Sequence, residues 1–220
     1  MKPKQFSKPV KRVALAALAA ILTLPALAAY EMKTWTHTSA SKKATYKYEY
    51  PQVAGKPTVN AKLKAAFLPT PAHLKEMDDL IGELNAESGP TTYAEEIKGS
   101  VTLHNERVIS VHYEGLGMLT PSAHPSKIIG GLTLELKTGR TLKLKDVLKA
   151  GALPLVKQEA LKALKPILET TTIPEVSKAG DFDFYLTKDK LVLINLFDSY
   201  AVASVEAEIP RAKLNGSLLY

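Results

Sequence analysis

Three hairpin-like patterns constrain the fold of this chain more than any other feature. Each has two apolar-patterned segments joined by a polar loop at 105–107, 138–140 or 188–190. Apolar residues alternate with polar ones in these segments except in 191–197, which is apolar on both faces and predicts a central strand. Alternation with a period of two is typical of a strand that buries one face. A three-residue loop places the apolar residues of both strands on one face, whereas a two-residue loop would place them on opposite faces. The sequence therefore predicts three antiparallel hairpins with three-residue loops.

The loop length also fixes the register that we predict for each hairpin. With three residues in the loop, the apolar residues of the two strands face one another in pairs. The predicted partners are Leu103–Ile109 and Val101–Val111 in the first hairpin, Leu136–Leu142 and Leu134–Leu144 in the second, and Leu186–Val192, Phe184–Ile194 and Phe182–Leu196 in the third.

A further strand is predicted ahead of the hairpins. Residues 45–50 alternate, and three tyrosines fall on one side of such a strand: Tyr46, Tyr48 and Tyr50. Pro51 is expected to end the strand, because proline has no backbone N–H to donate. The stretch 30–44, rich in Ser, Thr and Lys, is expected to be a loose lead-in.

Three helices are predicted from apolar residues at helical spacing. The first covers 59–67, and the second follows Thr70, which can cap it, with Pro71 in its first turn. The third covers 153–169, and a strand over 205–209 precedes a short helical stretch. Antiparallel runs of strands with a few helices indicate an α+β fold, in which helices pack against a mostly antiparallel β-sheet.

The segment 1–29 has the three parts of a secretory signal peptide. Its first 12 residues carry five basic side chains, an apolar run covers 13–24, and Pro25 is followed by Ala26-Leu27-Ala28. We expect cleavage after Ala28 or Ala29 and a mature protein that is periplasmic or secreted. A spanning helix needs about 20 apolar residues, so this shorter run predicts no stable membrane insertion after cleavage.

Removal of this segment changes the charge of the protein. The whole chain has 29 basic and 22 acidic residues, a net charge of +7. The segment 1–29 contains five of the basic residues and no acidic one, which leaves 24 basic residues against 22 acidic ones. Such a balance does not predict a nucleic-acid partner. The chain has no cysteine, so its stability must come from its core and not from disulfides.

Residues with catalytic or metal-binding chemistry form no recognisable motif. None of the five histidines has a second histidine at the i+4 spacing of a helical metal site: His37, His73, His104, His112 and His124. His104 and His112 are expected on a solvated face of the first hairpin. Ser122 lies two residues from His124, but the chain has no Gly-x-Ser-x-Gly turn. We therefore expect no enzymatic activity, no metal and no cofactor.

An ordered set of segments extends over residues 46–218. The most specific are Ala123-His124-Pro125 and the Leu-x-Leu-x-Thr-Gly-x-x-Leu-x-Leu pattern at 134–144, and the later ones are 182–186, 191–197 and 209–210. Together they resemble the extracytoplasmic RsiV-type domain, which also accompanies the catalytic domain of the peptidoglycan deacetylase PdaC. The resemblance divides the mature chain into an N-terminal PdaC/RsiV-like region, 30–120, and a C-terminal RsiV-like region, 121–220, expected to form one compact unit.

The resemblance implies an α+β fold and a binding role. In RsiV, an anti-sigma factor, this domain senses lysozyme by binding it directly. We therefore expect an exported, non-enzymatic binding protein whose partner is lysozyme or a cell-wall component such as peptidoglycan. Two alternatives stay open at this point: an enzyme that modifies peptidoglycan, and a structural protein of the envelope.

The expected ligand-binding residues lie in two segments, 119–127 and 197–204. Both fall in or beside the resembling segments, and both differ from the RsiV pattern, with Pro121-Ser122 in place of a Gly-Gly pair and no glycine soon after Tyr200. Binding residues concentrate on accessible loops. The expected set is His124, Ser122, Phe197 and Tyr200.

Overall fold

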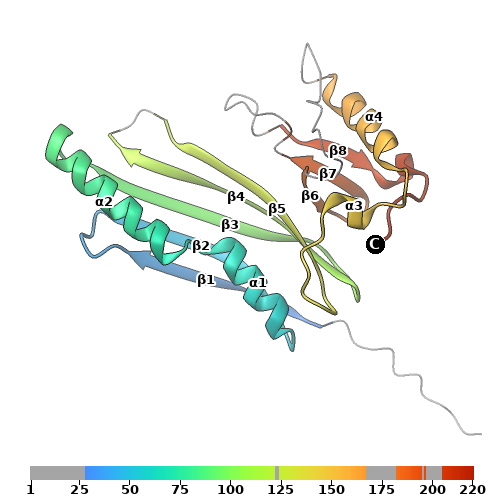
Figure 1. The fold of residues 1–220 in the computed structure, drawn as a ribbon, viewed down its shortest axis with the longest axis horizontal. Coiled ribbons are helices and arrows are strands. Elements are labelled where there is room, and N and C mark those ends of the chain that lie inside the picture. The colour runs from blue at the N-terminus through green and yellow to red at the C-terminus, as the bar shows by residue number, and fades with distance from the viewer. Residues whose placement is uncertain (1–27, 122–123, 167–181, 195, 197–204) are drawn as a thin grey trace, which may run out of the picture.

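The computed structural model describes residues 28–121, 124–166, 182–194, 196 and 205–220, which form two sheets (Figure 1). A five-stranded sheet has the order β1-β2-β3-β4-β5, and a three-stranded sheet has the order β6-β7-β8. The strands are β1 (Tyr30–Thr38), β2 (Ala44–Val53), β3 (Thr92–His104), β4 (Val108–Thr120), β5 (Ser126–Glu135), β6 (Asp183–Leu186), β7 (Lys190–Ile194) and β8 (Ala207–Pro210). The helices are α1 (Pro57–Phe67), α2 (Pro71–Ser88), α3 (Leu144–Val147), α4 (Leu153–Leu164) and the 3₁₀ helix η1 (Arg211–Leu214).

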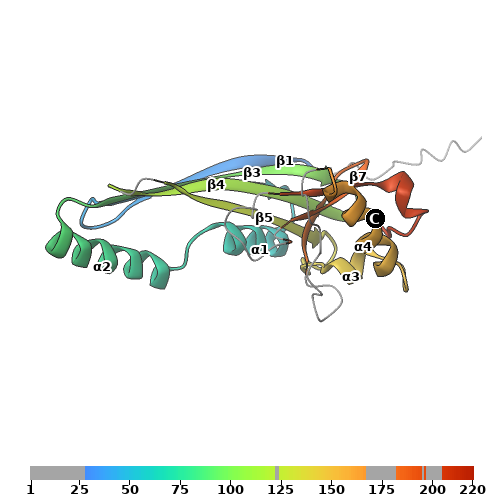
Figure 2. The same cartoon turned by 90° about the horizontal axis from the view of Figure 1, so that it is seen from above.

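The predicted α+β class is confirmed. All neighbouring strands are antiparallel except β2 and β3. Parallel neighbours need a crossover connection, and α1 with α2 supplies it. Both helices lie on one side of the five-stranded sheet (Figure 2), whereas α4 packs against β8.

The second and third predicted helices begin where the sequence predicts, and the first begins at Pro57, two residues before the predicted start. Thr70 caps α2, since its Oγ1 accepts a hydrogen bond from the N–H of His73 at 3.1 Å. The third predicted helix begins at Leu153 as α4, and its predicted residues 167–169 lie outside the described residues. None of the described helices is long and apolar enough to span a membrane.

The tyrosine strand is confirmed as β2, with its three alternating tyrosines buried beneath the helices. The prediction that Pro51 ends this strand is wrong, because β2 continues to Val53. Proline is tolerated there because pairing with β3 stops at Glu49, so Pro51 has only β1 as a neighbour.

The predicted lead-in is also wrong in part, because residues 30–38 form the edge strand β1. Its composition is polar because an edge strand beyond the helices buries little. Only Lys33, Trp35 and His37, on the side that carries the helices, are half-buried. Turn residues follow, and the N–H of Ser39 donates to the carbonyl of Ala44 at 2.9 Å.

The first hairpin forms, and Val101 lies opposite Val111 as predicted. The predicted pairing of Leu103 with Ile109 is wrong, because the register shifts between Val101 and Leu103. Thr102 is the extra residue of this β-bulge, and its Oγ1 donates to a carbonyl of β6 at 2.7 Å. The bulge turns Leu103 away from the first core and toward the core of the second sheet.

In the second predicted hairpin, the segment after the loop does not form a strand. Leu134 lies opposite Thr141 in an isolated bridge, and Leu144 begins α3 instead of pairing with Leu134. Leu136 packs in the core beneath the five-stranded sheet, whereas Leu142 packs in the core of the three-stranded sheet. The predicted register is wrong because these leucines serve two different cores.

The third hairpin has the two-residue loop 188–189. The N–H of Thr187 donates to the carbonyl of Lys190 at 2.9 Å, and Leu186 lies opposite Leu191. The predicted register is therefore wrong by one residue. The prediction from alternation fails because β7 is buried on both faces, so its apolar residues do not identify one side. Leu191 and Leu193 face one cluster, and Val192 and Ile194 face another.

The second sheet crosses one end of the first. The N–H of Leu186 on β6 donates to Ser110 Oγ on β4 at 2.8 Å, and a Cβ at Gly131 would lie 2.4 Å from the carbonyl oxygen of Phe184. Glycine is therefore required where β6 meets β5. The expected boundary at 120/121 falls in the β4–β5 turn, so both expected regions contribute strands to the five-stranded sheet.

Candidate functional site

The structure describes one of the four expected ligand-binding residues. His124 is exposed in the turn between β4 and β5. Ser122, Phe197 and Tyr200 lie outside the described residues. The expected set is therefore represented by one exposed turn residue among the described residues, and it stays a prediction.

A more extensive feature is the side of the five-stranded sheet that faces away from α1 and α2, which we call the open face (Figure 2). Strand pairing and alternation place every second residue of β2–β5 on it. β6 covers one end of this face, near Ser110. Away from that end, its side chains include Thr45, Lys47, Glu49, Ala94, Glu96, Lys98, Ser100, Glu114, Leu116, Met118, Lys127 and Ile129.

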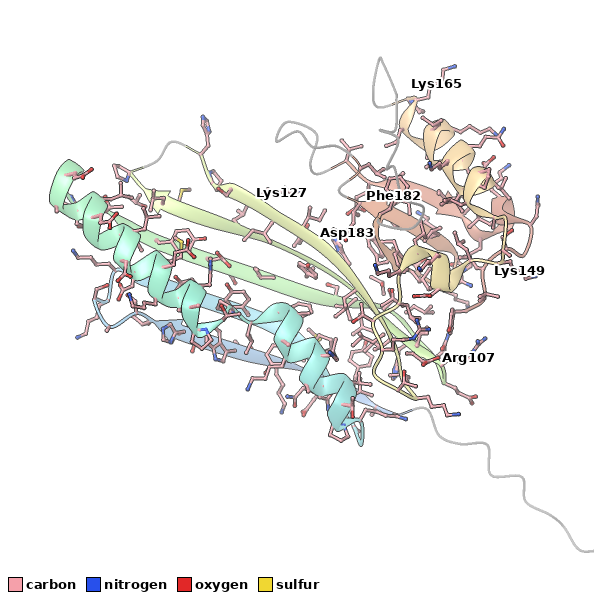
Figure 3. The ribbon with its side chains drawn as sticks, viewed as in Figure 1. Arg107, Lys127, Lys149, Lys165, Phe182 and Asp183 are labelled. Atoms are coloured by element: carbon pink, nitrogen blue, oxygen red, sulfur yellow. The ribbon has the colours of Figure 1, made fainter. Side chains whose placement is uncertain are left out.

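Two adjoining hollows form a groove along the open face. The larger has a volume of about 440 Å³ and lies between Lys98 on β3 and Lys127 on β5. The smaller, of about 300 Å³, continues to Lys47 on β2. Both are lined by Glu96 and Leu116, so we treat them as one open-face groove. Figure 3 marks Lys127 on β5.

The floor of the open-face groove is apolar. Leu116 lies between Glu96 on β3 and Lys127 on β5, and 51% of its surface is exposed. Ala94 and Met118 extend the apolar floor toward β2. An exposed apolar patch with a polar rim is a candidate binding surface, and methionine adapts its shape to different partners.

The rim of the groove carries both signs of charge. Lys47 Nζ lies 2.7 Å from Glu96 Oε1 and 3.8 Å from Glu49 Oε1. Lys98, Glu114 and Lys127 continue the alternation. The side chains of Lys47 and Glu96 are 48% and 64% exposed, so their ion pair is solvent-screened and can exchange partners.

The groove adjoins a polar junction between the two sheets. His112 on β4 lies with Nε2 3.3 Å from Glu206 Oε1, and its ring centroid is 4.7 Å from that of Tyr185. Tyr185 donates to Glu206 Oε2 at 2.9 Å. The contact with His112 is the main cause that holds the pKa of Glu206 below its usual range, and Tyr185 and Lys127 act in the same direction while burial opposes them.

The junction corrects one prediction about histidines. His112 is largely buried, with a side chain that is 17% exposed, and is not on a solvated face. His104 is half-buried against Tyr30, with ring centroids 5.5 Å apart, and burial lowers the pKa of His104. The bulge and the crossing second sheet account for this burial, and neither was visible in the hairpin pattern.

A second polar cluster lies on the opposite side of the sheet. The buried Glu95 carboxylate accepts hydrogen bonds from the phenols of Tyr48 and Tyr93, one on each oxygen. Burial and these bonds raise the pKa of both phenols. A Cβ at Gly117 would lie 2.6 Å from the Tyr93 hydroxyl, so glycine makes the room for this bond. Because each carboxylate oxygen accepts a hydrogen bond within the core, the cluster has a structural role and links β2 to β3.

Metal chemistry has no support among the residues that the structure describes. Within them, no group of three or more His, Asp or Glu side chains could hold a metal ion. The open-face groove is thus the leading candidate site. Its sequence signal lies in 110–118, where Leu116 and Met118 follow the alternate polar residues Ser110, His112 and Glu114.

Two solved structures resemble this chain over nearly its whole length. One is a DUF3298 family member from Bacteroides fragilis, with 17% identity, a TM-score of 0.56, and coverage of 88% of this chain and 95% of that one. The other is a DUF3298 family protein from Pseudomonas aeruginosa, with 16% identity, a TM-score of 0.59, and coverage of 87% and 94%. The chain has the DUF3298 fold.

Sequence comparison alone does not reach this fold. No family model matches the chain, and no curated protein matches it. The DUF3298 fold fits the predicted resemblance to RsiV-type and PdaC accessory domains at the level of fold.

Proposed function

We propose that this protein is a non-enzymatic binding protein that acts outside the cytoplasm and recognises a protein partner through the open-face groove. Lysozyme is the first partner to test, because the RsiV-type resemblance implies it. Peptidoglycan is the competing partner from the same resemblance.

The exposure of Leu116 is the observation that carries this proposal. A leucine that is half-exposed in the middle of a sheet, rather than at an edge, leaves apolar surface in water. Covering such surface contributes about 25 cal/mol per Å². A partner that seats an apolar side chain over Leu116 gains this term and can pair its polar groups with the rim.

The charges of the rim favour a protein surface over a polyanion. Three basic side chains alternate with three acidic ones: Lys47, Lys98, Lys127, Glu49, Glu96 and Glu114. A nucleic acid would meet the carboxylates with repulsion. Alternating charges suit a partner with its own mixed charges, because complementary charges fix the orientation of a complex and exclude wrong partners.

The position of β1 supports a role after export. β1 begins at Tyr30, directly after the proposed cleavage sites. The carbonyl of Ala29 accepts a hydrogen bond from Ala54 at 2.7 Å. Cleavage after Ala28 would keep this bond, and cleavage after either alanine would leave the whole of β1 in the mature protein.

The test is a pair of calorimetric titrations of the mature protein, one with lysozyme and one with soluble peptidoglycan fragments. Saturable binding of lysozyme alone is the expected result. Binding of the fragments alone would show that the partner is a glycan and not a protein. Binding of neither ligand would contradict both proposed partners. Release of new reducing ends or acetate from the fragments would show an enzyme instead.

A further inference from the structure

The outer edge of β1 is a second surface that could bind a partner, because its backbone groups have no neighbouring strand among the described residues. Within the described residues β1 pairs only with β2, and its register runs without a bulge from Tyr30 to Thr38. The other edge of this sheet, β5, is contacted by β6 and β7. A row of backbone N–H and C=O groups on β1 therefore faces outward.

Natural proteins protect such edges with prolines, bulges, shortness or charges. β1 has nine residues, which is long for an edge strand, and it contains no proline. Its two charged residues, Glu31 and Lys33, pair with each other at 2.7 Å, which reduces their protective effect. Tyr30 and Met32 are exposed large side chains, at 44% and 42%.

We propose that two copies of this chain associate by antiparallel pairing of their β1 strands about a two-fold axis at Thr34. The two five-stranded sheets then join into one sheet. This register pairs all nine residues of each strand. It sets Lys33 of one copy against Trp35 of the other, and Glu31 against His37.

The charges select this register over its neighbours. An axis at Lys33 would place two lysines opposite each other, and like charges across strands destabilise a pair. An axis at Trp35 would place Lys33 opposite His37. An axis at Met32 pairs Glu31 with Lys33 but overlaps only residues 30–34. The axis at Thr34 places no like charges opposite each other, allows a cation–π contact between Lys33 and Trp35, and keeps the full overlap.

The pairing has a consequence for the open face. A two-fold axis perpendicular to the joined sheet places both open faces on the same side. The two open-face grooves then point in the same direction, and a surface that carries two partner molecules would be bound with avidity. The association itself does not depend on what the groove binds.

The absence of cysteine from the chain makes a direct test possible. In the Thr34→Cys variant, the two introduced thiols meet on the axis, where paired Cα atoms lie about 4.5–5.5 Å apart, within disulfide range. In the matched Thr36→Cys variant, the thiols sit two residues from the axis in each copy, about 13 Å apart at 3.3 Å per residue. Both positions are exposed on the same face of β1, so neither change disturbs a core.

The measurement is the fraction of disulfide-linked dimer after mild oxidation of the mature variants, together with sedimentation equilibrium of the parent across a hundredfold range of concentration. We expect a concentration-dependent dimer of the parent and at least a fivefold higher dimer fraction for Thr34→Cys than for Thr36→Cys. A parent that sediments as a monomer throughout would overturn the proposal. Equal cross-linking of the two variants would overturn it as well, since it would indicate random collision.

Discussion

His112 Nε2 and Glu206 Oε1 lie 3.3 Å apart across the boundary between the two sheets. His112 belongs to β4, and Glu206 directly precedes β8. Among the described residues His112 Nε2 has no aligned hydrogen bond, and its contact with Glu206 lowers the pKa of the Glu206 carboxyl. The packing of the second sheet against the first, beside the open-face groove, should therefore depend on pH.

We expect acid to weaken this junction. The pKa of Glu206 is lowered in the folded protein, chiefly by His112. A carboxylate of this kind stabilises the fold at pH values above its unfolded pKa, near 4.5, and that stabilisation is lost as pH falls through the lower folded pKa. Glu206→Gln should lower the free energy of unfolding at pH 7 by about 1 kcal/mol or less, because the site is part-exposed, and should lower the melting temperature accordingly.

The difference in melting temperature between Glu206→Gln and the parent should shrink below pH 4.5. Glu208→Gln is the control, because Glu208 is 52% exposed and pairs only with Lys190 among the described residues. Thermal unfolding at pH 7, 5 and 3 measures both variants. A difference that grows in acid would contradict the assigned role of Glu206.

The Glu95 cluster should be a sensitive point of the core. Tyr48→Phe removes one hydrogen bond from a buried carboxylate that lies between β2 and β3. Leaving a buried polar group short of a partner costs about 1–3 kcal/mol. Chemical denaturation should show this loss, whereas Glu96→Gln, on the exposed side of the same strand, should change stability by less than about 1 kcal/mol. Equal effects would place Glu95 outside the core.

The contact between the sheets should not tolerate a side chain at Gly131. Gly131→Ala would bring a Cβ to 2.4 Å from the Phe184 carbonyl, so β6 must shift. We expect destabilisation of about 1–3 kcal/mol. The matched change, Gly82→Ala on α2, meets no atom within 4 Å and should stabilise by about 0.5–1 kcal/mol. A Gly131→Ala variant as stable as the parent would show that β6 does not pack there.

The sequence predicts correctly those elements that are buried on one face only. Tyr46, Tyr48 and Tyr50 lie on a strand with one buried face, so alternation located both the strand and its core side. Helix starts were predicted well because Thr70 and the prolines at 71 and 154 act locally.

The register could not be predicted where a segment is buried on both faces or contributes to two cores. β7 is apolar on both faces, and Leu136 and Leu142 serve different cores, so neither pattern identifies a partner. The bulge at Thr102 depends on its bond to β6, which is distant in sequence. The candidate site was missed for a related reason. Accessible loops, such as the one that contains His124, are where binding residues are expected, whereas Leu116 lies within a strand.

The most direct test of the account compares lysozyme binding by Leu116→Asp and Leu80→Asp with that of the parent, by calorimetric titration. Leu116 is 51% exposed on the open face, and Leu80 is 42% exposed on α2, so both changes place a charge at a similarly exposed leucine. Removal of a central apolar contact costs about 2 kcal/mol or more at a hot spot. We predict that Leu80→Asp binds like the parent and that Leu116→Asp binds at least about tenfold more weakly. Equal affinities of the two variants, or a parent that does not bind lysozyme, would contradict the claim that the open-face groove recognises this partner.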